Sequence, residues 1–384
     1  MATAARLRDF GTTIFTEMSA LAARTGAINL GQGFPDTDGP AEIVAAAERA
    51  LRSGAANQYA PLAGVPELCA AIAGHQRRHY GLAIDPQDGV QVTFGATEAI
   101  AATMLGLLEP GDEVVVLEPF YDSYAAAIAM AGATRRLVTL RAPDFGLDLD
   151  ALATAARGAR MLVLNSPHNP TGRVLTRAEL EAVACACVDN DLVAVTDEVY
   201  EHLVYDGEHI PLATLPGMAE RTLTISSAGK SFSFTGWKIG WASGPPQLVG
   251  AVRSAKQFLS FAGGTPLQHA VAAALPDAER HVAPLRAALQ ASRDRLCDGL
   301  RTIGLTVCVP QGGYFVNADI ASLGADDARR WCRALPARAG VVAIPTSAFY
   351  DDAAAGPTLV RFAFCKRPEV IEAAIERLQA AGVA

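Results

Sequence analysis

The sequence lacks an apolar run of the ~20 residues that a membrane-spanning helix needs. Residues 1–15 also lack a continuous apolar core followed by small residues, so we expect no signal peptide. Basic residues do not cluster, and 32 Lys and Arg against 40 Asp and Glu give a net charge of −8. An acidic chain without a basic patch disfavours binding to nucleic acid or an anionic membrane. We therefore expect a cytoplasmic protein with neither partner.

Cysteine is scarce and has no pattern: the chain has seven, an odd number, and no CxxC pair. A disulfide framework or a zinc-binding cysteine pair would need regular spacing, so we expect neither, and no metal site. Cys185 and Cys187 lie in an alanine-rich helical pattern, where we expect both to be packed. This usage of cysteine is typical of a reducing cytosol.

Short β-branched runs alternate with Ala- and Leu-rich helical stretches through the middle of the chain. The expected strands are Val90–Thr93, Glu113–Leu117, Met161–Asn165, Leu192–Thr196 and Thr222–Ser226. The expected helices include Ala99–Leu108, Arg177–Asp189 and Pro246–Phe258. This alternation predicts an α/β fold with a mostly parallel sheet and helices on both faces. Ligands of such sheets bind outside the carboxyl ends of the strands.

The length of 384 residues suggests two domains, at roughly 100–200 residues each. A long amphipathic stretch, Glu279–Thr302, predicts a helix that leads into a smaller α+β domain. The expected strands of that domain are Thr306–Val309, Tyr314–Ala318, Val341–Ile344 and Leu359–Ala363. We assign residues 36–275 to the large domain and 276–384 to the small one. Residues 1–35 have little sheet character and could fold onto either domain; we assign them to the small one.

Three motifs follow expected strands at the edge where a ligand would bind. Gly95–Glu98 opens a helix, so it could form an anion site or an ordinary capped turn. Tyr121 could stack on a planar ring or anchor a loop. Asn165–Gly172 contains two prolines, two Asn and a Gly, which demand a fixed turn. Within it, Asn169 could offer its amide to a ligand oxygen, and we expect His168 to be a turn residue.

Two further motifs carry charge. Asp197 and Glu198 follow a buried strand, where a carboxylate is costly unless a cation such as a protonated ring nitrogen pairs with it. We expect one of the two to be an ordinary solvated charge. Lys230 and Lys238 lie in a segment of small, hydroxyl and aromatic residues. An apolar setting lowers the pKa of a lysine and makes it a nucleophile, whereas a surface loop would leave both lysines solvated.

The order and spacing of these motifs resemble the class I aminotransferases of fold type I. The likeness is strongest to their kynurenine/glutamine/methionine and N-succinyldiaminopimelate groups, and it runs from Asn29–Asp36 to Val360–Phe362. It implies a seven-stranded type of sheet, pyridoxal 5′-phosphate (PLP) in the large domain, amino and oxo acids as substrates, and a homodimer. Many class I relatives have Arg where Lys238 stands, but the kynurenine branch also uses Lys there.

The resemblance also implies roles for individual residues. Lys230 would carry PLP as a Schiff base and shuttle the substrate proton, while Asp197 pairs with the pyridinium nitrogen and Tyr200 bonds the phenolic oxygen. Arg361, Gly33 and Asn169 would bind the substrate. The implied cofactor-binding residues are Tyr59 (from the partner subunit), Ala96, Thr97, Tyr121, Asn169, Asp197, Tyr200, Ser227, Lys230 and Lys238.

The substrate implied by the resemblance is less sharply defined. The stretches Glu17–Ala22, Ser166–Gly172 and Gly236–Trp241 look most like N-succinyldiaminopimelate aminotransferases. We therefore expect amino transfer between N-succinyl-LL-2,6-diaminopimelate and 2-oxoglutarate, in lysine biosynthesis. The alternative is a broad kynurenine, glutamine or methionine aminotransferase, or a cysteine-S-conjugate β-lyase. The side-chain pocket candidates are Ile14, Phe15, Tyr59, Thr265 and Tyr314.

Overall fold

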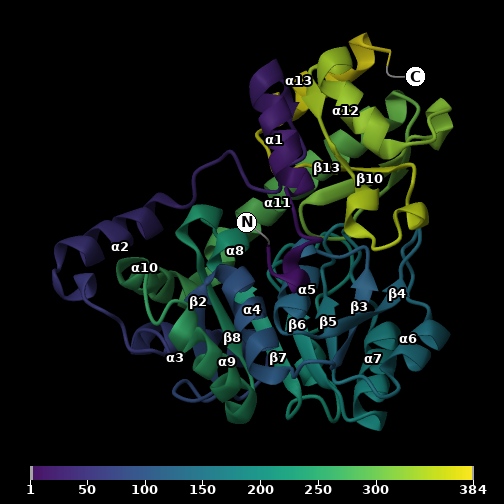
Figure 1. Cartoon of the computed structure of the whole chain (residues 1–384). Coiled ribbons are helices and arrows are strands. Elements are labelled where there is room, and N and C mark those ends of the chain that lie inside the picture. The colour runs from purple at the N-terminus through teal and green to yellow at the C-terminus, as the bar shows by residue number, and fades with distance from the viewer. Residues whose placement is uncertain (1–2, 383–384) are drawn as a thin grey trace.

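The computed structural model of the protein describes residues 3–382, and its centre is a seven-stranded sheet (Figure 1). The strand order is β2-β8-β7-β6-β5-β3-β4, and only β8 runs antiparallel to its neighbours. The strands are β2 Val90–Phe94, β3 Glu113–Glu118, β4 Thr134–Thr139, β5 Met161–Asn165, β6 Val193–Asp197, β7 Thr222–Ser227 and β8 Ile239–Ser243. The expected α/β class and mostly parallel sheet are confirmed, while β4 and β8 were not expected.

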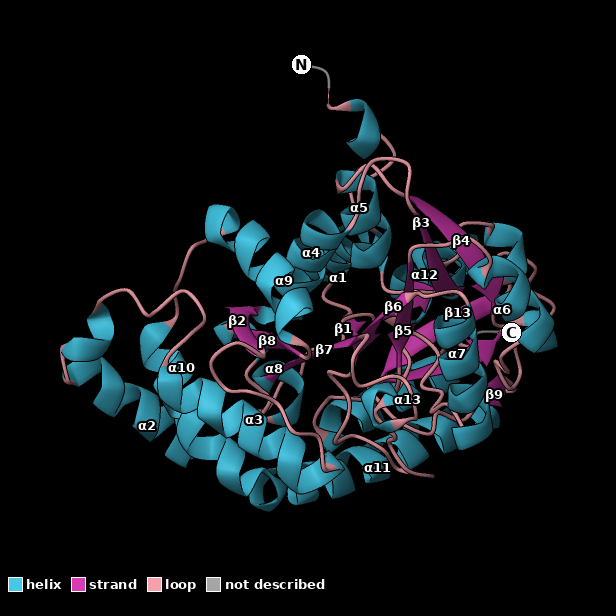
Figure 2. Ribbon diagram, turned by 90° about the horizontal axis from the view of Figure 1, so that it is seen from below, coloured by secondary structure: helices cyan, strands magenta, loops and turns pink. Residues whose placement is uncertain are grey.

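Helices cover both faces of this sheet (Figure 2). Val114 and Val116 of β3 pack with α4 (Gly95–Leu107), α5 (Asp122–Met130) and α9 (Pro246–Leu259). Val115 and Leu117 point to the other face, towards α6 (Leu149–Ala156) and α7 (Arg177–Asp189). Successive side chains of a strand alternate between faces, so a strand buried on both sides is apolar throughout. The polar residues of these strands therefore gather at their ends.

A second sheet of four antiparallel strands has the order β12-β13-β10-β9. Its strands are β9 Thr306–Cys308, β10 Phe315–Asp319, β12 Ile344–Pro345 and β13 Leu359–Ala363, accompanied by α11 Ala278–Thr302, α12 Ala328–Ala339 and α13 Pro368–Ala380. Near the N-terminus, α1 (Ile14–Thr25) packs on α12, and β1 (Ile28–Asn29) pairs with β11 (Val341–Val342). Figure 1 shows α1 beside these C-terminal elements. The single strand expected at Val341–Ile344 is therefore wrong, because β11 and β12 belong to different sheets.

Three further helices, α2 (Ala41–Arg52), α3 (Pro66–Tyr80) and α10 (Thr265–Ala274), pack together near the β2 edge of the large sheet. The short α8 (Ala228–Ser231) directly follows β7 and contacts β8 and α11. The cysteines of the described residues are all free. Cys187 is buried but Cys185 is exposed, so the expectation that both are packed was wrong: two residues along α7 turn the side chain to the opposite face. Within residues 3–382, no helix combines the length and apolar character needed to cross a membrane.

Candidate active site

A cavity of about 330 Å³ opens at the carboxyl ends of β5, β6 and β7. Of the residues predicted for the site, the structure places these along it: Gly33, Ala96, Thr97, Tyr121, Asn169, Asp197, Tyr200, Ser227, Lys230, Lys238 and Arg361. Tyr59 does not line it. Its walls also contain residues to which no role was given in advance, among them Gln32, Phe34, Asn165, Thr235, Ile239 and Phe315. The cavity therefore joins segments from both ends of the chain.

Lys230 lies in α8, directly after β7, and its amine faces into the cavity. Its Nζ donates a hydrogen bond to the carbonyl of Gly33 at 2.9 Å and lies 5.6 Å from the Tyr200 ring centre and 5.3 Å from that of Tyr314. The Tyr314 hydroxyl donates to the Lys230 carbonyl at 2.9 Å. Burial lowers the pKa of Lys230 to about 8. The lysine is thus held in place, and a larger fraction of its amine is neutral near physiological pH than for a solvated lysine.

Asp197 ends β6 and is buried. It accepts a hydrogen bond from the Tyr124 hydroxyl at 2.6 Å and one from the Val199 N–H at 3.3 Å. Burial raises the pKa of Asp197 to about 6, although both hydrogen bonds act to lower it. Glu198 is also buried and pairs with Nε2 of His209 at 2.9 Å. The expectation that one of the two carboxylates is solvated was wrong, because an imidazole beyond the motif pairs with the second one.

Arg361 lies on β13 and is 1% exposed. Its guanidinium donates to Oδ1 of Asn169 at 3.0 Å and to the carbonyl of Gly31 at 3.1 Å, and it stacks 3.8 Å from the Phe315 ring centre. Its Nε has no hydrogen-bond partner. Burial lowers the pKa of Arg361 to about 9. Neutral oxygens and aromatic faces surround this cation, and no ion pair of the described residues includes it.

The opposite end of the cavity has the features of an anion site. Helix α4 begins at Gly95, and a Cβ placed on Gly95 would lie only 3.0 Å from Nζ of Lys238. A Cβ on Gly240 would lie 2.5 Å from the Gly95 carbonyl carbon, so only glycine lets β8 pack this closely. Lys238 itself adopts φ +56°, a conformation that non-glycine residues rarely take. Helix N–H groups, an ammonium and the Ser227 hydroxyl thus converge on one point.

Asn165 connects two of the strand ends, a role that the sequence analysis did not give it. Its Nδ2 donates to the Asp197 carbonyl at 2.7 Å, and its Oδ1 accepts from the Asn169 N–H at 2.6 Å. The signal was available, because Asn165 is the last residue of β5 and begins the proline-rich turn. His168 is a buried turn residue as expected, with Nδ1 2.8 Å from the Thr171 hydroxyl.

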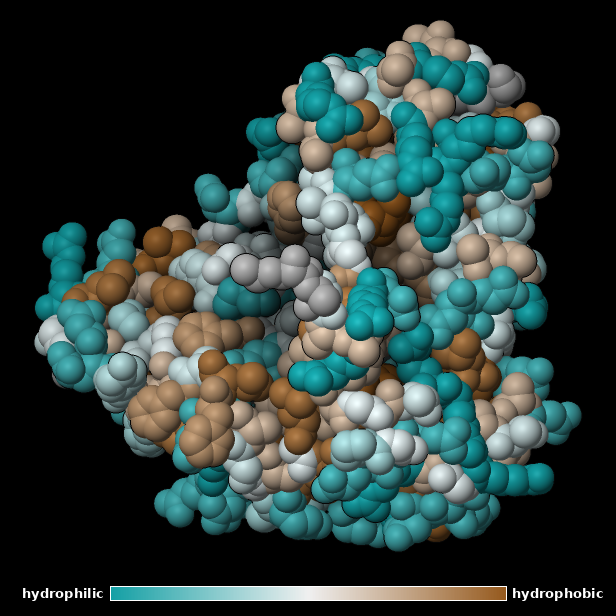
Figure 3. All heavy atoms as spheres, viewed as in Figure 1, coloured by the Kyte–Doolittle hydropathy of each residue, from teal (hydrophilic) through white to brown (hydrophobic). Residues whose placement is uncertain are grey.

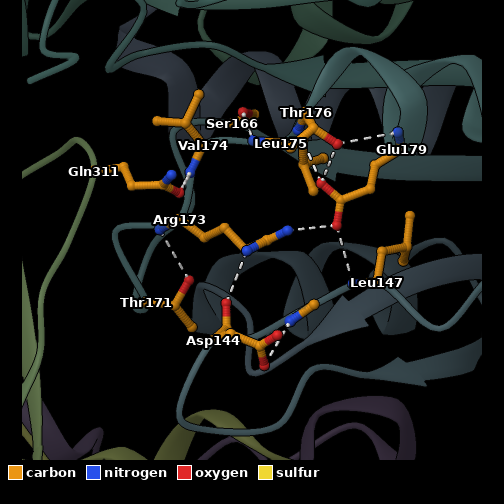
Figure 4. A network of polar contacts seen from close by, with 11 residues as sticks. Asp144, Leu147, Ser166, Thr171, Arg173, Val174, Leu175, Thr176, Glu179 and Gln311 are labelled. Atoms are coloured by element: carbon orange, nitrogen blue, oxygen red, sulfur yellow. Dashed lines mark hydrogen bonds and ion pairs between the residues drawn. The ribbon is translucent and has the colours of Figure 1, made fainter. Parts of the chain in front are cut away.

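A polar network fixes the far side of this turn (Figure 4). Arg173 donates to Glu179 at 2.6 Å and to the Asp144 carbonyl at 2.9 Å, while its own N–H contacts the Thr171 hydroxyl at 3.3 Å. Glu179 also forms a capping box with Thr176 at the start of α7. The turn that presents Asn169 is therefore anchored to α7 rather than free to move.

The residues proposed for the substrate side chain are only partly in the cavity. Phe15 lines it, whereas Tyr314 is fully buried behind Lys230. Ile14 and Thr265 do not line it; Thr265 donates to the Gln58 carbonyl at 3.1 Å. Tyr59 is 80% exposed and lies edge-on to Phe261 with 5.5 Å between ring centres. Sequence spacing alone does not identify Phe315 as a residue of the cavity wall, because only the fold brings β10 beside the cavity.

The cavity fits the cofactor that the resemblance implies. PLP combines a phosphate, a basic ring nitrogen, a carbonyl and a flat ring. The α4 anion site matches the phosphate, and the Asp197 carboxylate has no ion-pair partner of its own, which suits a cationic ring nitrogen. The lowered pKa of the Lys230 amine makes it a better nucleophile, which suits a carbonyl. Tyr121, edge-on to Tyr124 with 5.8 Å between centres, offers an aromatic wall.

Comparison with known proteins gives a consistent result. The family model for aminotransferase class I and II matches residues 25–378. A probable N-succinyldiaminopimelate aminotransferase of Mycobacterium tuberculosis is 55% identical, with 98% of each chain covered. A solved structure of N-succinyldiaminopimelate aminotransferase from the same organism matches with a TM-score of 0.96 at 55% identity, covering 99% of this chain and 100% of that one. Kynurenine–oxoglutarate transaminase 3 of Mus musculus is 37% identical, covering 98% and 90%.

The lowered pKa of Lys230 can be tested directly. In cofactor-free protein, the Lys230 amine should react with a small aldehyde at a rate that rises about tenfold per pH unit and levels off near pH 8. Borohydride trapping and peptide mass spectrometry measure this rate at Lys230 alone. Free Nα-acetyl-lysine, which titrates near ~10.4, is the control. A Lys230 profile as alkaline as that control would show that burial does not lower its pKa.

Proposed function

The chain belongs to the class I and II aminotransferases, and we propose that it transfers the amino group of N-succinyl-LL-2,6-diaminopimelate to 2-oxoglutarate. The protein is a PLP-dependent transferase, as its family is. The observation that carries the substrate proposal is the 55% identity, over 98% of both chains, to a relative named for this substrate. We further propose that the reaction serves lysine biosynthesis in the cytoplasm; seven free cysteines are consistent with a reducing compartment.

We propose the following roles around the cofactor. Bound PLP supplies a carbonyl that accepts the amino group and a ring that withdraws electrons. Lys230 would hold the cofactor at its carbonyl group and would carry a proton away from the substrate Cα. An amine with a pKa of about 8 suits that task near neutral pH. Asp197 keeps the ring nitrogen protonated, and its hydrogen bond from Tyr124 favours the carboxylate over the acid.

Other residues would position the cofactor without moving protons. We assign the phosphate to the start of α4, at Ala96 and Thr97, together with Ser227 and Lys238. Tyr121 would stack on the ring. Tyr200 and Asn169 would donate hydrogen bonds to the phenolic oxygen; burial raises the pKa of Tyr200, which keeps its hydroxyl protonated for this purpose.

We assign the substrate α-carboxylate to Arg361, with Gly33 and Asn169 beside it. Arg361 is a buried cation whose Nε lacks a partner, and an arginine fork can bind a carboxylate in a bidentate manner. Every amino acid and oxo acid has this group, so one arginine can serve both half-reactions. This explains how a single site can accept two substrates with different side chains.

The walls of the cavity favour a second candidate as well. Arg361 is the only arginine among the described residues that line the cavity, and three phenylalanines lie there: Phe15, Phe34 and Phe315. A wall of this kind suits the aromatic or thioether side chain of kynurenine or methionine. A broad aminotransferase that uses these donors is therefore the alternative function.

We propose that the protein is a homodimer in which Tyr59 reaches the phosphate in the partner subunit's site. Tyr59 is far more exposed than an aromatic side chain with a structural role in one chain would be. Figure 3 shows hydrophobic side chains over α2, α4 and α9, where Leu51, Leu105 and Phe258 are exposed. An apolar surface of this kind is typical of a subunit interface.

A donor panel tests the substrate proposal. Holoenzyme is given 2-oxoglutarate and, in turn, N-succinyl-LL-2,6-diaminopimelate, kynurenine, methionine and glutamine, and glutamate formation is measured as kcat/KM. We expect the succinylated donor to exceed the others by at least about tenfold, which corresponds to ~1.4 kcal/mol of transition-state binding. Equal or greater kcat/KM for kynurenine or methionine would instead establish the broad aminotransferase.

Arg361→Ala tests the carboxylate assignment. Loss of a charge-assisted hydrogen-bonded pair should weaken the binding of amino donor and 2-oxoglutarate alike, each by about 1.5–3 kcal/mol. Steady-state KM values and competitive inhibition by dicarboxylates give both numbers. The control is Arg330→Ala, which removes an exposed arginine paired only with Asp326. Unchanged affinity for 2-oxoglutarate in Arg361→Ala would refute the assignment.

A further inference from the structure

A second group of polar residues lies outside the cavity, between α3 and the segment that follows β6. His75, Glu201 and His202 are all buried, and each offers one ligand atom that lies within 4.8 Å of the other two. Glu201 and His202 directly follow Tyr200, and none of the three lines the cavity. The amino-transfer mechanism therefore leaves this group without a function.

The spacing within the group suits a metal ion. Nε2 of His75 and Nε2 of His202 are 2.9 Å apart. Two imidazole nitrogens bound to one Zn²⁺ at ~2.0–2.1 Å lie roughly 3.3–3.4 Å from each other at the tetrahedral angle, so the two rings would separate by a few tenths of an ångström to admit the ion. The Glu201 carboxylate accepts hydrogen bonds from Tyr80 at 2.7 Å and Ser226 at 2.6 Å. Those two hydroxyls leave lone pairs on both carboxylate oxygens, and they would hold the carboxylate in place as outer partners of a ligand.

Charge and hydrogen bonding in the group are incomplete without an ion. Glu201 is a buried carboxylate, and within residues 3–382 no Lys or Arg forms an ion pair with it. Nδ1 of His75, the ring nitrogen that would not bind the ion, is buried and has no hydrogen-bond partner. Imidazole nitrogens and a carboxylate oxygen are donors that bind divalent metals in proteins.

A third imidazole borders the group on its solvent side. His79 follows His75 by one turn of α3, so both rings lie on the same face of that helix. The His79 ring centre is 4.5 Å from that of His75 and 5.4 Å from that of His202, and His79 is exposed. Its nitrogens are not among the ligand atoms that lie within 4.8 Å of one another, so His79 packs against the group without being one of its ligands.

We propose that His75, His202 and Glu201 bind one Zn²⁺ per chain. Two imidazole nitrogens and one carboxylate oxygen are three of the four ligands that zinc takes in tetrahedral geometry, and a water molecule would fill the fourth position. The ion would tie α3 to the segment that carries Tyr200. Sequence analysis did not reveal this site, because its ligands come from two distant segments and none is a cysteine.

Zinc binding to the holoenzyme tests the proposal. The protein is dialysed against a chelator, loaded with Zn²⁺ and gel-filtered, and its metal content is measured by mass spectrometry. We expect one Zn²⁺ per chain and a higher unfolding temperature in Zn²⁺ than in chelator. Co²⁺ in place of Zn²⁺ should give the visible ligand-field bands of a tetrahedral site. A metal-free protein with an unchanged unfolding temperature would overturn the proposal and leave a hydrogen-bonded histidine pair.

Variants locate the ion. His202→Gln should weaken Zn²⁺ binding at least about 100-fold, since even outer partners of metal ligands contribute ~10–100-fold. Glu201→Gln keeps the size of the side chain and removes its charge, so its weaker binding remains a test if His202→Gln does not fold. His269→Ala, on α10, is the control and should bind as the unaltered protein does. Zn²⁺ binding that is the same in Glu201→Gln and His269→Ala would contradict the site.

Discussion

The burial of three charges without ion-pair partners is the constraint on which the cavity depends. Lys230, Asp197 and Arg361 converge on one space, and no ion pair of the described residues includes them. A buried charge costs several kcal/mol unless something compensates it. Here neutral oxygens, a tyrosine hydroxyl and aromatic rings compensate in part. The remaining compensation requires a ring cation for Asp197, a carbonyl for Lys230 and a carboxylate for Arg361. PLP and an amino acid together supply these three groups.

The fold brings these charges together in a way that no local segment could. Asp197 and Lys230 follow adjacent strands of the large sheet, whereas Arg361 belongs to a strand of the smaller one. Gly31 and Gly33, from the segment after β1, provide carbonyls to Arg361 and Lys230. The N-terminal segment thus bonds to α8, which follows a strand of the large sheet, and to β13 of the smaller sheet.

The sequence predicted the strand ends well, because strands buried on both faces are apolar until they end. Met161–Asn165 and Leu359–Ala363 were predicted to the residue. The sequence-based prediction failed where a residue's interaction partner lies in a distant segment of the chain. Edge strand β4 carries two arginines, β8 begins directly after Lys238, and His209 pairs with Glu198 across a loop. Tertiary proximity decides these features. The domain bounds and residue roles stay predictions.

One measurement tests most directly whether these charges serve amino transfer. Holoenzyme given an excess of amino donor and no oxo acid should form one oxo acid per active site, release no ammonia and stop. Added 2-oxoglutarate should restart turnover and form glutamate. Continuous release of ammonia in the absence of any oxo acid acceptor would contradict the account, because the same cavity would then serve a lyase.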